Sequence, residues 1–150
     1  MNYYEVQKEN YQISTDISKL NIDFIYQYLS EESYWAEGIP KEVVEKSIQN
    51  SVCFGLYCNK SQIGFARVIT DKATFAYLAD VFILQSHRGK GLSKWLIQTI
   101  HTHPELQGLR RWMLGTRDAH GLYERFGWKK LTEDTAKRFM QKHNPDVYKR

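Results

Sequence analysis

Arg88-Gly89-Lys90-Gly91-Leu92-Ser93 is the stretch that decides the fold, because it joins the apolar run at residues 81–84 to an amphipathic segment that begins at Leu92. This segment is predicted to be a helix, since its apolar residues recur at the i, i+3, i+4, i+7 and i+8 spacing of one helical face. These residues are Leu92, Trp95, Leu96, Thr99 and Ile100. The sequence therefore predicts a strand, a turn and a helix in succession.

The turn before that helix is suited to bind a phosphate. The first N–H groups of a helix lack intrahelical partners, and together with the positive end of the helix dipole they attract an anion. Gly89 and Gly91 let the backbone come close to the anion, and Arg88 and Lys90 add positive charge. We therefore expect residues 88–93 to hold a phosphate-bearing cofactor, with an ordinary basic turn as the alternative.

Two well-known phosphate loops do not match this turn. The nucleoside-triphosphatase loop needs a Gly, four residues and then Gly-Lys-Ser/Thr, which the chain lacks. The dinucleotide loop needs a third glycine at the position of Lys94. Arg88-x-x-Gly91-x-Ser93 instead resembles the acetyl-coenzyme A loop of the GCN5-related N-acetyltransferase (GNAT) family, Arg/Gln-x-x-Gly-x-Gly/Ala, with the small Ser93 departing from the last position.

Residues 116–128 carry a second resemblance to the same family. The family segment reads Asn-x-x-Ala-x-x-Leu-Tyr-x-x-x-Gly-Phe, and here Thr116 replaces the Asn and Trp128 replaces the Phe. The residues that match in register are Ala119, Leu122, Tyr123 and Gly127. Two motifs in the family's order identify the chain as a member of the GNAT family. The resemblance implies an acetyl-coenzyme A site that includes residues 88–93, Thr116 and Tyr123.

Length and composition agree with a single enzyme domain spanning residues 1–150. The chain is 42% hydrophobic and 25% charged, which is ordinary for a globular protein, and no window approaches the roughly 18 apolar residues of a membrane span. The opening residues 1–5 lack the basic and apolar parts of a secretory signal, so a cytoplasmic, membrane-free protein is expected. The net charge of +4 is modest and does not indicate a nucleic-acid partner.

The order of predicted elements is mixed α/β. A first strand at 11–14 is followed by a helix around residues 22–29 and by a second helix after Pro40. Three strands at 52–57, 63–70 and 75–83 then form an antiparallel meander. After the loop and its crossover helix, a strand at 111–116 runs parallel to its predecessor, and a short helix contains Tyr123.

The GNAT resemblance implies that the two parallel strands splay apart and that the pantetheine arm of the cofactor lies between them. In this chain the splayed segments are residues 80–83 and 112–116. The free backbone groups of a splayed strand can bind an amide-rich arm much as they bind a neighbouring strand. We therefore expect backbone contacts from Phe82 and Ile83, whose side chains also suit core packing.

The implied chemistry is direct attack of an amine on a thioester through a tetrahedral intermediate. By resemblance, Tyr123 donates a proton to the leaving thiolate, and a backbone N–H near Ile83 stabilises the oxyanion. A phenol of pKa about 10 gives its proton uphill to a thiolate whose conjugate acid has a pKa near 8.5. Tyr123 is thus expected to assist turnover. The alternative is that Tyr123 is a buried aromatic residue that only packs.

A general base has two candidates. Asp80 is predicted to share one strand face with Leu78 and Phe82, where a carboxylate needs a partner or a catalytic purpose. A structural salt bridge with Arg67, or a turn-capping contact, is the equally weighted alternative to a catalytic role. His120, three residues before Tyr123, is the second candidate, with helix capping or plain surface exposure as its alternative.

The acceptor site is expected between the first two helices and beyond the splay. Tyr34 and Trp35 would form an aromatic wall and Glu37 would hold a cation, whereas Arg67 and Arg117 would suit a carboxylate. The alternative for Trp35 is that its side chain simply covers the hydrophobic core. An amino-acid-like acceptor and a polyamine both remain open.

The resulting hypothesis is an N-acetyltransferase that uses acetyl-coenzyme A and acts on the primary amine of a small molecule. A protein or peptide acceptor and a non-catalytic acyl-coenzyme A-binding module are the alternatives. No metal is expected, because His101 and His103 have no third ligand at suitable spacing. Strand edges near the C-terminus would be available to a second copy, so a homodimer is a further hypothesis.

Overall fold

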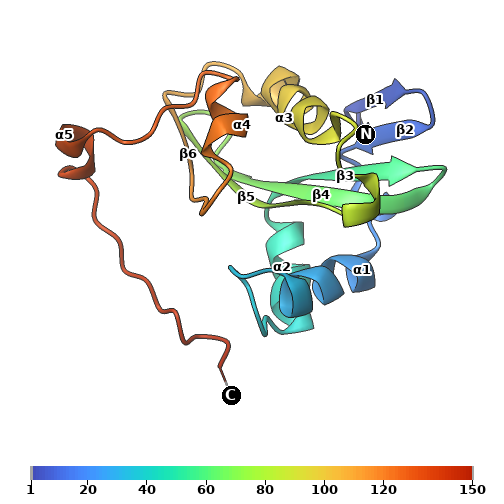
Figure 1. Cartoon of the computed structure of the whole chain (residues 1–150), viewed down its shortest axis with the longest axis horizontal. Helices are drawn as coiled ribbons and strands as arrows, with labels where there is room; N and C mark the ends of the chain where they lie inside the picture. The colour runs from blue at the N-terminus through green and yellow to red at the C-terminus, as the bar shows by residue number, and fades with distance from the viewer. Residues whose placement is uncertain (1, 150) are drawn as a thin grey trace.

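One six-stranded sheet carries the other elements of the computed structural model, which describes residues 2–149 (Figure 1). Neighbouring strands follow the chain order, β1 to β5 pair antiparallel, and β5 and β6 pair parallel. The strands are β1 (Glu5–Lys8), β2 (Tyr11–Ser14), β3 (Val52–Cys58), β4 (Ser61–Thr70), β5 (Phe75–Ile83) and β6 (Arg111–Leu114). The predicted meander and parallel strand are confirmed. Strand β1 was not predicted, because its residues are mostly exposed and lack a regular apolar alternation.

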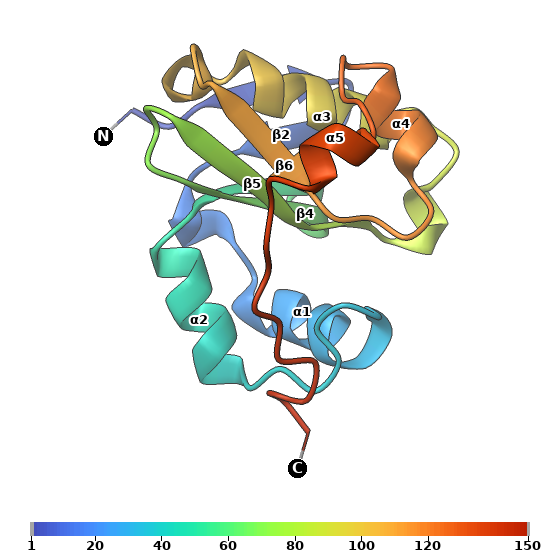
Figure 2. The same ribbon diagram turned by 90° about the vertical axis from the view of Figure 1, so that its left-hand side faces the viewer.

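Helices cover both faces of this sheet (Figures 1 and 2). On one face lie α1 (Ile22–Gln27), its π-helical continuation (Tyr28–Glu32) and α2 (Lys41–Gln49); on the other lie α3 (Leu92–Thr102) and α4 (His120–Glu124). Short 3-10 turns occur at Ile17–Lys19, Gln85–His87 and Pro104–Leu106, and α5 (Glu133–Ala136) stands away from the sheet. Within the described residues, no helix combines the length and apolar character needed to cross a bilayer.

Two hydrophobic cores lie on opposite faces of the sheet. The first packs α3 against the strands and includes Ile13, Phe54, Leu56, Val68, Leu78, Leu96, Ile97 and Ile100. The second packs α1 and α2 against the other face and includes Ile25, Leu29, Val44, Ile48, Phe65 and Phe82. The predicted face of α3 is confirmed, since Leu92, Leu96, Thr99 and Ile100 are buried and Trp95 is half-buried.

A bulge in β5 corrects one prediction from the sequence. Phe82 is opposite Phe65 and Ala79 is opposite Arg67, so β5 has one more residue than β4 over this interval. Asp80 sits in this bulge with a φ of 55°, in the left-handed region. Leu78 consequently packs in the first core and Phe82 in the second. The prediction that Leu78, Asp80 and Phe82 share one face is wrong, because a bulge interrupts the two-residue period.

The parallel pairing of β5 with β6 is short. It joins Phe75–Leu78 of β5 to Arg111–Leu114 of β6 and stops there, although β5 runs on to Ile83. The strand predicted at 111–116 therefore ends two residues early. The bulge lies just beyond Leu78, and residues 80–83 continue without β6 beside them, as the predicted splay requires. The predicted splayed segment 112–116 is wrong in part, because residues 112–114 pair with β5 and β6 leaves it only after Leu114.

His101 joins the end of α3 to β6 and to the segment after α4. Its Nε2 accepts a hydrogen bond of 2.9 Å from Nε1 of Trp128, and its ring lies edge-on to Trp112 with centroids 4.8 Å apart. Trp128 in turn contacts Tyr123, at a centroid distance of 5.8 Å. Burial lowers the pKa of His101, which keeps the imidazole neutral and able to accept this bond.

We expect the free energy of unfolding to fall as the pH drops below about 6.5, the ordinary histidine pKa. Burial lowers the pKa of both His101 and His103, so the unfolded chain binds more protons than the folded one in acid. Replacing His101 by Gln, which keeps an acceptor for Trp128 but does not titrate, should flatten this dependence. Urea unfolding between pH 5 and 8 measures this pH dependence, and His120→Gln is the control for removing a histidine. If the free energy of unfolding varied with pH in the same way in wild type and in His101→Gln, His101 would not be a source of the dependence.

Candidate active site

The loop before α3 has the geometry of an anion site. Gly91 occupies the N-cap with a φ of 77°, and no side chain caps the helix. The N–H groups of the first turn are consequently left for another partner. Gly89 also has a positive φ, and a Cβ on either glycine would meet nothing within 4 Å. The glycines are therefore required by the backbone conformation, and the space beside them is open.

Arg88 points back into the protein. Its Nε donates to the carbonyl oxygen of Ile83 at 2.9 Å, and its Nη2 donates to the hydroxyl of Tyr28 at 3.4 Å. The ring of Tyr28 stacks on that of Phe82, with centroids 3.8 Å apart. Arg88 thus ties the loop to the end of β5 and to the π-helical turn, and the Ile83 carbonyl already has a donor.

A cleft of about 700 Å³, here called the acceptor cleft, opens where β5 and β6 separate. The end of β5, the residues after β6, the loop between α1 and α2 and the C-terminal segment all contribute to it. Among the residues predicted from the sequence, it is lined by Tyr34, Trp35, Arg67, Asp80, Thr116, Arg117 and Tyr123. The structure therefore brings together most of the predicted acceptor residues and the predicted proton donor.

Both carboxylate oxygens of Asp80 already have donors. Nε1 of Trp35 donates to Oδ1 and Nε of Arg67 donates to Oδ2, each at 2.8 Å, and only 9% of the Asp80 side chain is exposed. Arg67 also donates from Nη1 to the hydroxyl of Ser51 at 3.1 Å. The salt bridge considered as the alternative role of Asp80 is thus present, and it fixes Trp35 at the edge of the cleft.

Arg117 joins the loop after β6 to the loop between the first two helices. Its backbone N–H donates to the hydroxyl of Tyr34 at 3.0 Å, and its guanidinium carbon lies 3.9 Å from the centroid of the Tyr34 ring. No acidic side chain among residues 2–149 pairs with this guanidinium. The cleft therefore has a positioned cation that is available to an anionic group.

Tyr123 lines the acceptor cleft from α4 and is only 8% exposed. Burial raises its pKa to about 12, with a smaller effect from the nearby Tyr34. The phenol is therefore protonated throughout the physiological range. A protonated hydroxyl at this place can donate a hydrogen bond into the cleft.

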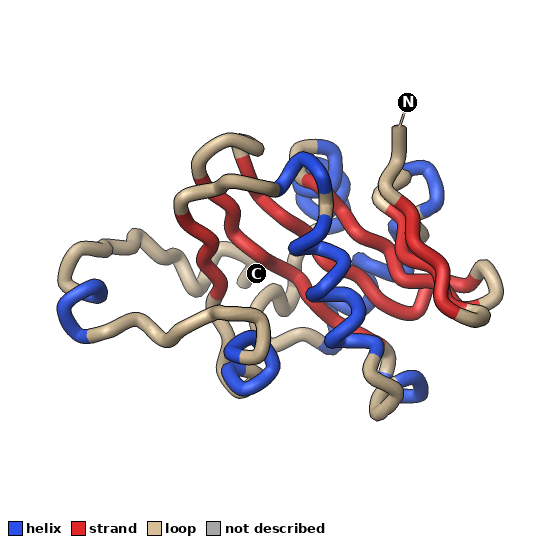
Figure 3. The backbone as a smooth tube through the Cα atoms, turned by 90° about the horizontal axis from the view of Figure 1, so that it is seen from above, coloured by secondary structure: helices blue, strands red, loops and turns tan. Residues whose placement is uncertain are grey.

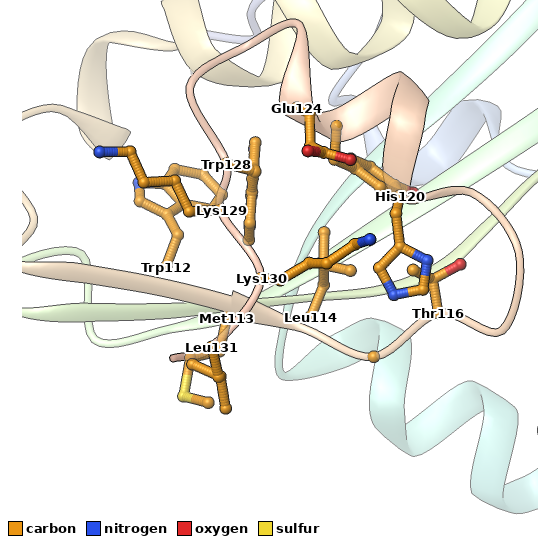
Figure 4. Close-up of a pocket in the computed structure, with 12 residues that line it drawn as sticks. Trp112, Met113, Leu114, Thr116, His120, Glu124, Trp128, Lys129, Lys130 and Leu131 are labelled. Atoms are coloured by element: carbon orange, nitrogen blue, oxygen red, sulfur yellow. The ribbon is translucent and has the colours of Figure 1, made fainter. Parts of the chain in front are cut away.

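A smaller cleft of about 270 Å³, whose lining includes His120, Glu124 and Trp128, adjoins the acceptor cleft (Figure 4). Tyr123 lines both clefts. His120 starts α4, is exposed, and lines this smaller cleft but not the acceptor cleft. Thr116 lines both clefts, and its hydroxyl accepts from the N–H of Ala119 at 3.1 Å. The two base candidates, Asp80 and His120, are thus placed in different cavities.

Glu37 also lies apart from the acceptor cleft. It lines a recess of about 540 Å³ formed by the loop between α1 and α2 and by the C-terminal segment. His143 and Tyr148 of that segment line both the recess and the acceptor cleft. Sequence reasoning missed these two residues, because the tail has no apolar periodicity or motif that indicates where it returns to the sheet.

The open helix N-terminus, the splayed strands and the cleft beside Tyr123 define an acyltransferase that uses coenzyme A. Residues 49–130 match the family profile described as an acetyltransferase (GNAT) domain. A candidate acetyltransferase of Gibberella zeae, FG08082, is 36% identical to this chain. The match covers 76% of this chain and 76% of the length of FG08082. The chain belongs to the GNAT family and is an acetyltransferase.

Solved structures of the family agree with this assignment. A candidate GNAT acetyltransferase of Xanthomonas campestris is 44% identical, with a TM-score of 0.91 over 96% of this chain and 100% of its own. A GNAT acetyltransferase of Elizabethkingia anophelis, solved with acetyl-coenzyme A bound, is 13% identical, with a TM-score of 0.62 over 83% of this chain and 80% of its own. The second likeness shows the shared fold.

Replacing Gly91 by Ala should lower the free energy of unfolding by about 1–2 kcal/mol, because an L-residue is strained at its φ of 77°. Acetyl-coenzyme A affinity should fall as well, since the new methyl group enters the open space beside the loop. Gly121→Ala is the control, because Gly121 lies within α4 at an ordinary φ and its Cβ would also meet nothing within 4 Å. Urea unfolding and calorimetric titration check both variants; equal effects of the two substitutions would contradict the assignment.

Proposed function

We propose that residues 1–150 act as one catalytic domain that transfers the acetyl group of acetyl-coenzyme A to the primary amine of a small molecule. The observation that carries this proposal is the position of Tyr123, whose side chain lines the acceptor cleft at the point where β5 and β6 separate. Acetyl-coenzyme A supplies an activated acetyl thioester. The remaining tasks belong to the residues of this chain.

The cofactor would be held mainly by backbone groups. The N-terminus of α3 has no side-chain cap and the space beside Gly89 and Gly91 is open, so the N–H groups of residues 89–93 would suit the pyrophosphate, with Lys90 adding charge. Phe82 and Ile83 lie on the part of β5 that β6 does not pair, so backbone groups there other than the Ile83 carbonyl, which Arg88 binds, would suit the pantetheine arm. Arg88 would act by holding the loop against the Ile83 carbonyl, and Thr116 by holding the turn before α4.

Tyr123 would serve as a hydrogen-bond donor to the departing sulfur. Full proton transfer from a phenol with a pKa of about 12 to a thiolate with a pKa near 8.5 would cost about 5 kcal/mol. A hydrogen bond from the neutral phenol stabilises the developing thiolate without that cost. This role depends only on the phenol remaining protonated.

The acceptor amine would enter the cleft already neutral. Both oxygens of Asp80 accept from Trp35 and Arg67, and His120 is exposed and lines the smaller cleft, so in this proposal neither takes a proton from the amine. At pH 7, neutralising an amine of pKa about 10.4 costs about 4.6 kcal/mol, whereas an amine of pKa about 8 costs about 1. The site therefore favours an amine of low pKa over a lysine or a polyamine.

Arg117 would bind an anionic group of the same acceptor. Its guanidinium is held on the Tyr34 ring and lines the cleft without a carboxylate partner among residues 2–149. An acceptor with a low-pKa amine and a carboxylate or phosphate satisfies both features. A non-catalytic binding module would leave the free Tyr123 hydroxyl without a purpose.

Replacing Tyr123 by Phe should lower kcat roughly ten- to a thousand-fold, because the donor to the leaving sulfur is lost. Any basic limb in the pH–rate profile below pH 10 should persist in this variant, since burial keeps the Tyr123 pKa at about 12. Tyr57→Phe is the matched control, as it removes another buried hydroxyl far from the cleft. Thiol release at saturating substrates measures the effect, and an unchanged rate in Tyr123→Phe would remove this role.

The acceptor class can be tested with pairs of amines that differ only in a negative group. Suitable pairs are glucosamine with glucosamine 6-phosphate, and Ala-Ala amide with Ala-Ala, with spermidine as the polyamine. We expect kcat/KM to be about tenfold higher for the anionic member of a pair, and Arg117→Ala to abolish that preference while Arg125→Ala keeps it. Arg125 is exposed and lines neither cleft. Acetylation of none of these amines would argue against the proposed function, and a preference for spermidine would argue against the acceptor class.

A further inference from the structure

The C-terminal residues 129–149, here called the strap, leave the domain and come back to it. After Trp128 the chain passes outward through α5 and returns to the side of α1 and α2, as two perpendicular views show (Figures 1 and 2). Seen from above, the strap forms a loop beyond the edge of the sheet (Figure 3). Residues at its two ends are therefore close to the domain while its middle is not.

The middle of the strap is weakly attached. Met140 is 99% exposed and Leu131 is 52% exposed. The contact of this part with the sheet is a cation–π contact in which the guanidinium carbon of Arg111 lies 4.6 Å from the centroid of the Phe139 ring. Few buried contacts imply a low local free energy of opening.

The far end of the strap is compact and anchored. The N–H of Lys149 donates to the carbonyl of Asp146 at 3.0 Å, and the N–H of Asp146 donates to Oδ1 of Asn144 at 3.1 Å. The side chain of Tyr148 is half-buried and packs against the second core. A short turned segment thus carries one aromatic anchor.

Tyr148 rests on a glycine that leaves little room for any other residue. Gly38 has a φ of 79°, and a Cβ placed there would lie 3.2 Å from the backbone oxygen of Tyr148 and 3.7 Å from its Cβ. Gly38 belongs to the loop between α1 and α2, which also carries Tyr34 and Trp35. The anchor therefore seats the strap directly beside the aromatic wall of the acceptor cleft.

The anchored end also lines the site itself. His143 and Tyr148 face the acceptor cleft and the neighbouring recess, together with Tyr34 and Trp35. The same two segments, the loop between α1 and α2 and the end of the strap, therefore line both cavities. An acceptor in the cleft would contact the strap as well as the sheet.

We propose that residues 143–149 form the outer wall of the acceptor site, and that Tyr148 seated on Gly38 holds this wall in place. The inference rests on the proposed function, because it assigns the cleft to the acceptor. It also specifies the acceptor class of the proposed function. A wall on this side of the cleft leaves room for a small amine and obstructs a polypeptide, whose chain would have to continue past the strap.

Two substitutions test the wall from opposite sides. Tyr148→Ala removes the anchor, and Gly38→Ala displaces it without altering the strap. Met140→Ala is the matched control, because it changes a strap residue that is fully exposed and lines neither cavity. Amide hydrogen exchange of segments 33–39 and 143–149 reports on release of the strap in each variant and does not depend on activity.

The kinetic probes are Ala-Ala, glucosamine 6-phosphate and a peptide of about twelve residues that begins with Ala-Ala. In both test variants we expect faster amide hydrogen exchange of the two segments. The Kd for acetyl-coenzyme A should stay within about twofold of wild type, whereas KM should rise roughly tenfold or more for the small amine that wild type acetylates. The kcat/KM of the long peptide relative to that of Ala-Ala should rise about tenfold in the same variants.

Three results would overturn the inference. An unchanged small-amine KM in a variant whose strap exchanges faster would show that the strap is no part of the site. Equal kcat/KM for Ala-Ala and the long peptide in wild type would show that the strap obstructs nothing. If wild type acetylates none of the probes, the proposed function fails and the inference fails with it, an outcome that is visible before any variant is compared.

Discussion

The pairing of β5 with β6 ends at Leu78 and Leu114, and the architecture of the site depends on that limit. Backbone N–H and C=O groups in a folded protein need hydrogen-bond partners. Where the parallel pairing ends early, the groups on that edge of the remaining strand need another partner. The bulge at Asp80 enforces the limit by bending β5 away from β6. The gap, the cleft at its mouth and the loop before α3 are all arranged around this separation.

The bulge also determines which side chains meet in the cleft. It turns Asp80 toward the α1–α2 face, where Arg67 and Trp35 bind its two oxygens. The two donors satisfy this buried carboxylate, and the carboxylate in turn holds the aromatic side chain of Trp35 at the rim of the cleft. Arg117 and Tyr34 form a second link between the same loop and the segment after β6. Two polar links therefore connect the loop between α1 and α2 to β5 and to the segment after β6.

Much of this arrangement could be predicted from local patterns. The i, i+3, i+4 spacing after Leu92 defined α3, and the glycines at 89 and 91 marked a turn whose positive φ values only glycine adopts easily. Three strand-like runs between residues 52 and 83, separated by turns at Asn59-Lys60 and Asp71-Lys72, predicted the meander. These features follow from interactions between residues close in sequence, and such interactions can be predicted from the spacing of apolar residues and turn residues along the chain.

Other features depend on contacts between distant residues. The bulge arises from a mismatch between β4 and β5 that neither strand shows alone, so the face assigned to Leu78 was wrong. Arg88 was expected at a phosphate, yet its nearest acceptors are Ile83 and Tyr28, and the latter is far away in the sequence. The return of Tyr148 to Gly38 has no local signal, because a single aromatic residue in a polar tail has no period.

The weak attachment of the strap has an evolutionary consequence. Residues 129–149 contribute to the acceptor cleft while adding little to either hydrophobic core, Tyr148 excepted. Their sequence can therefore drift, lengthen or be exchanged at little cost to folding, whereas the β5 bulge and the α3 loop cannot. Under the proposed function, a lineage built on this scaffold can acquire a new substrate through changes in its tail while the loop assigned to coenzyme A stays as it is.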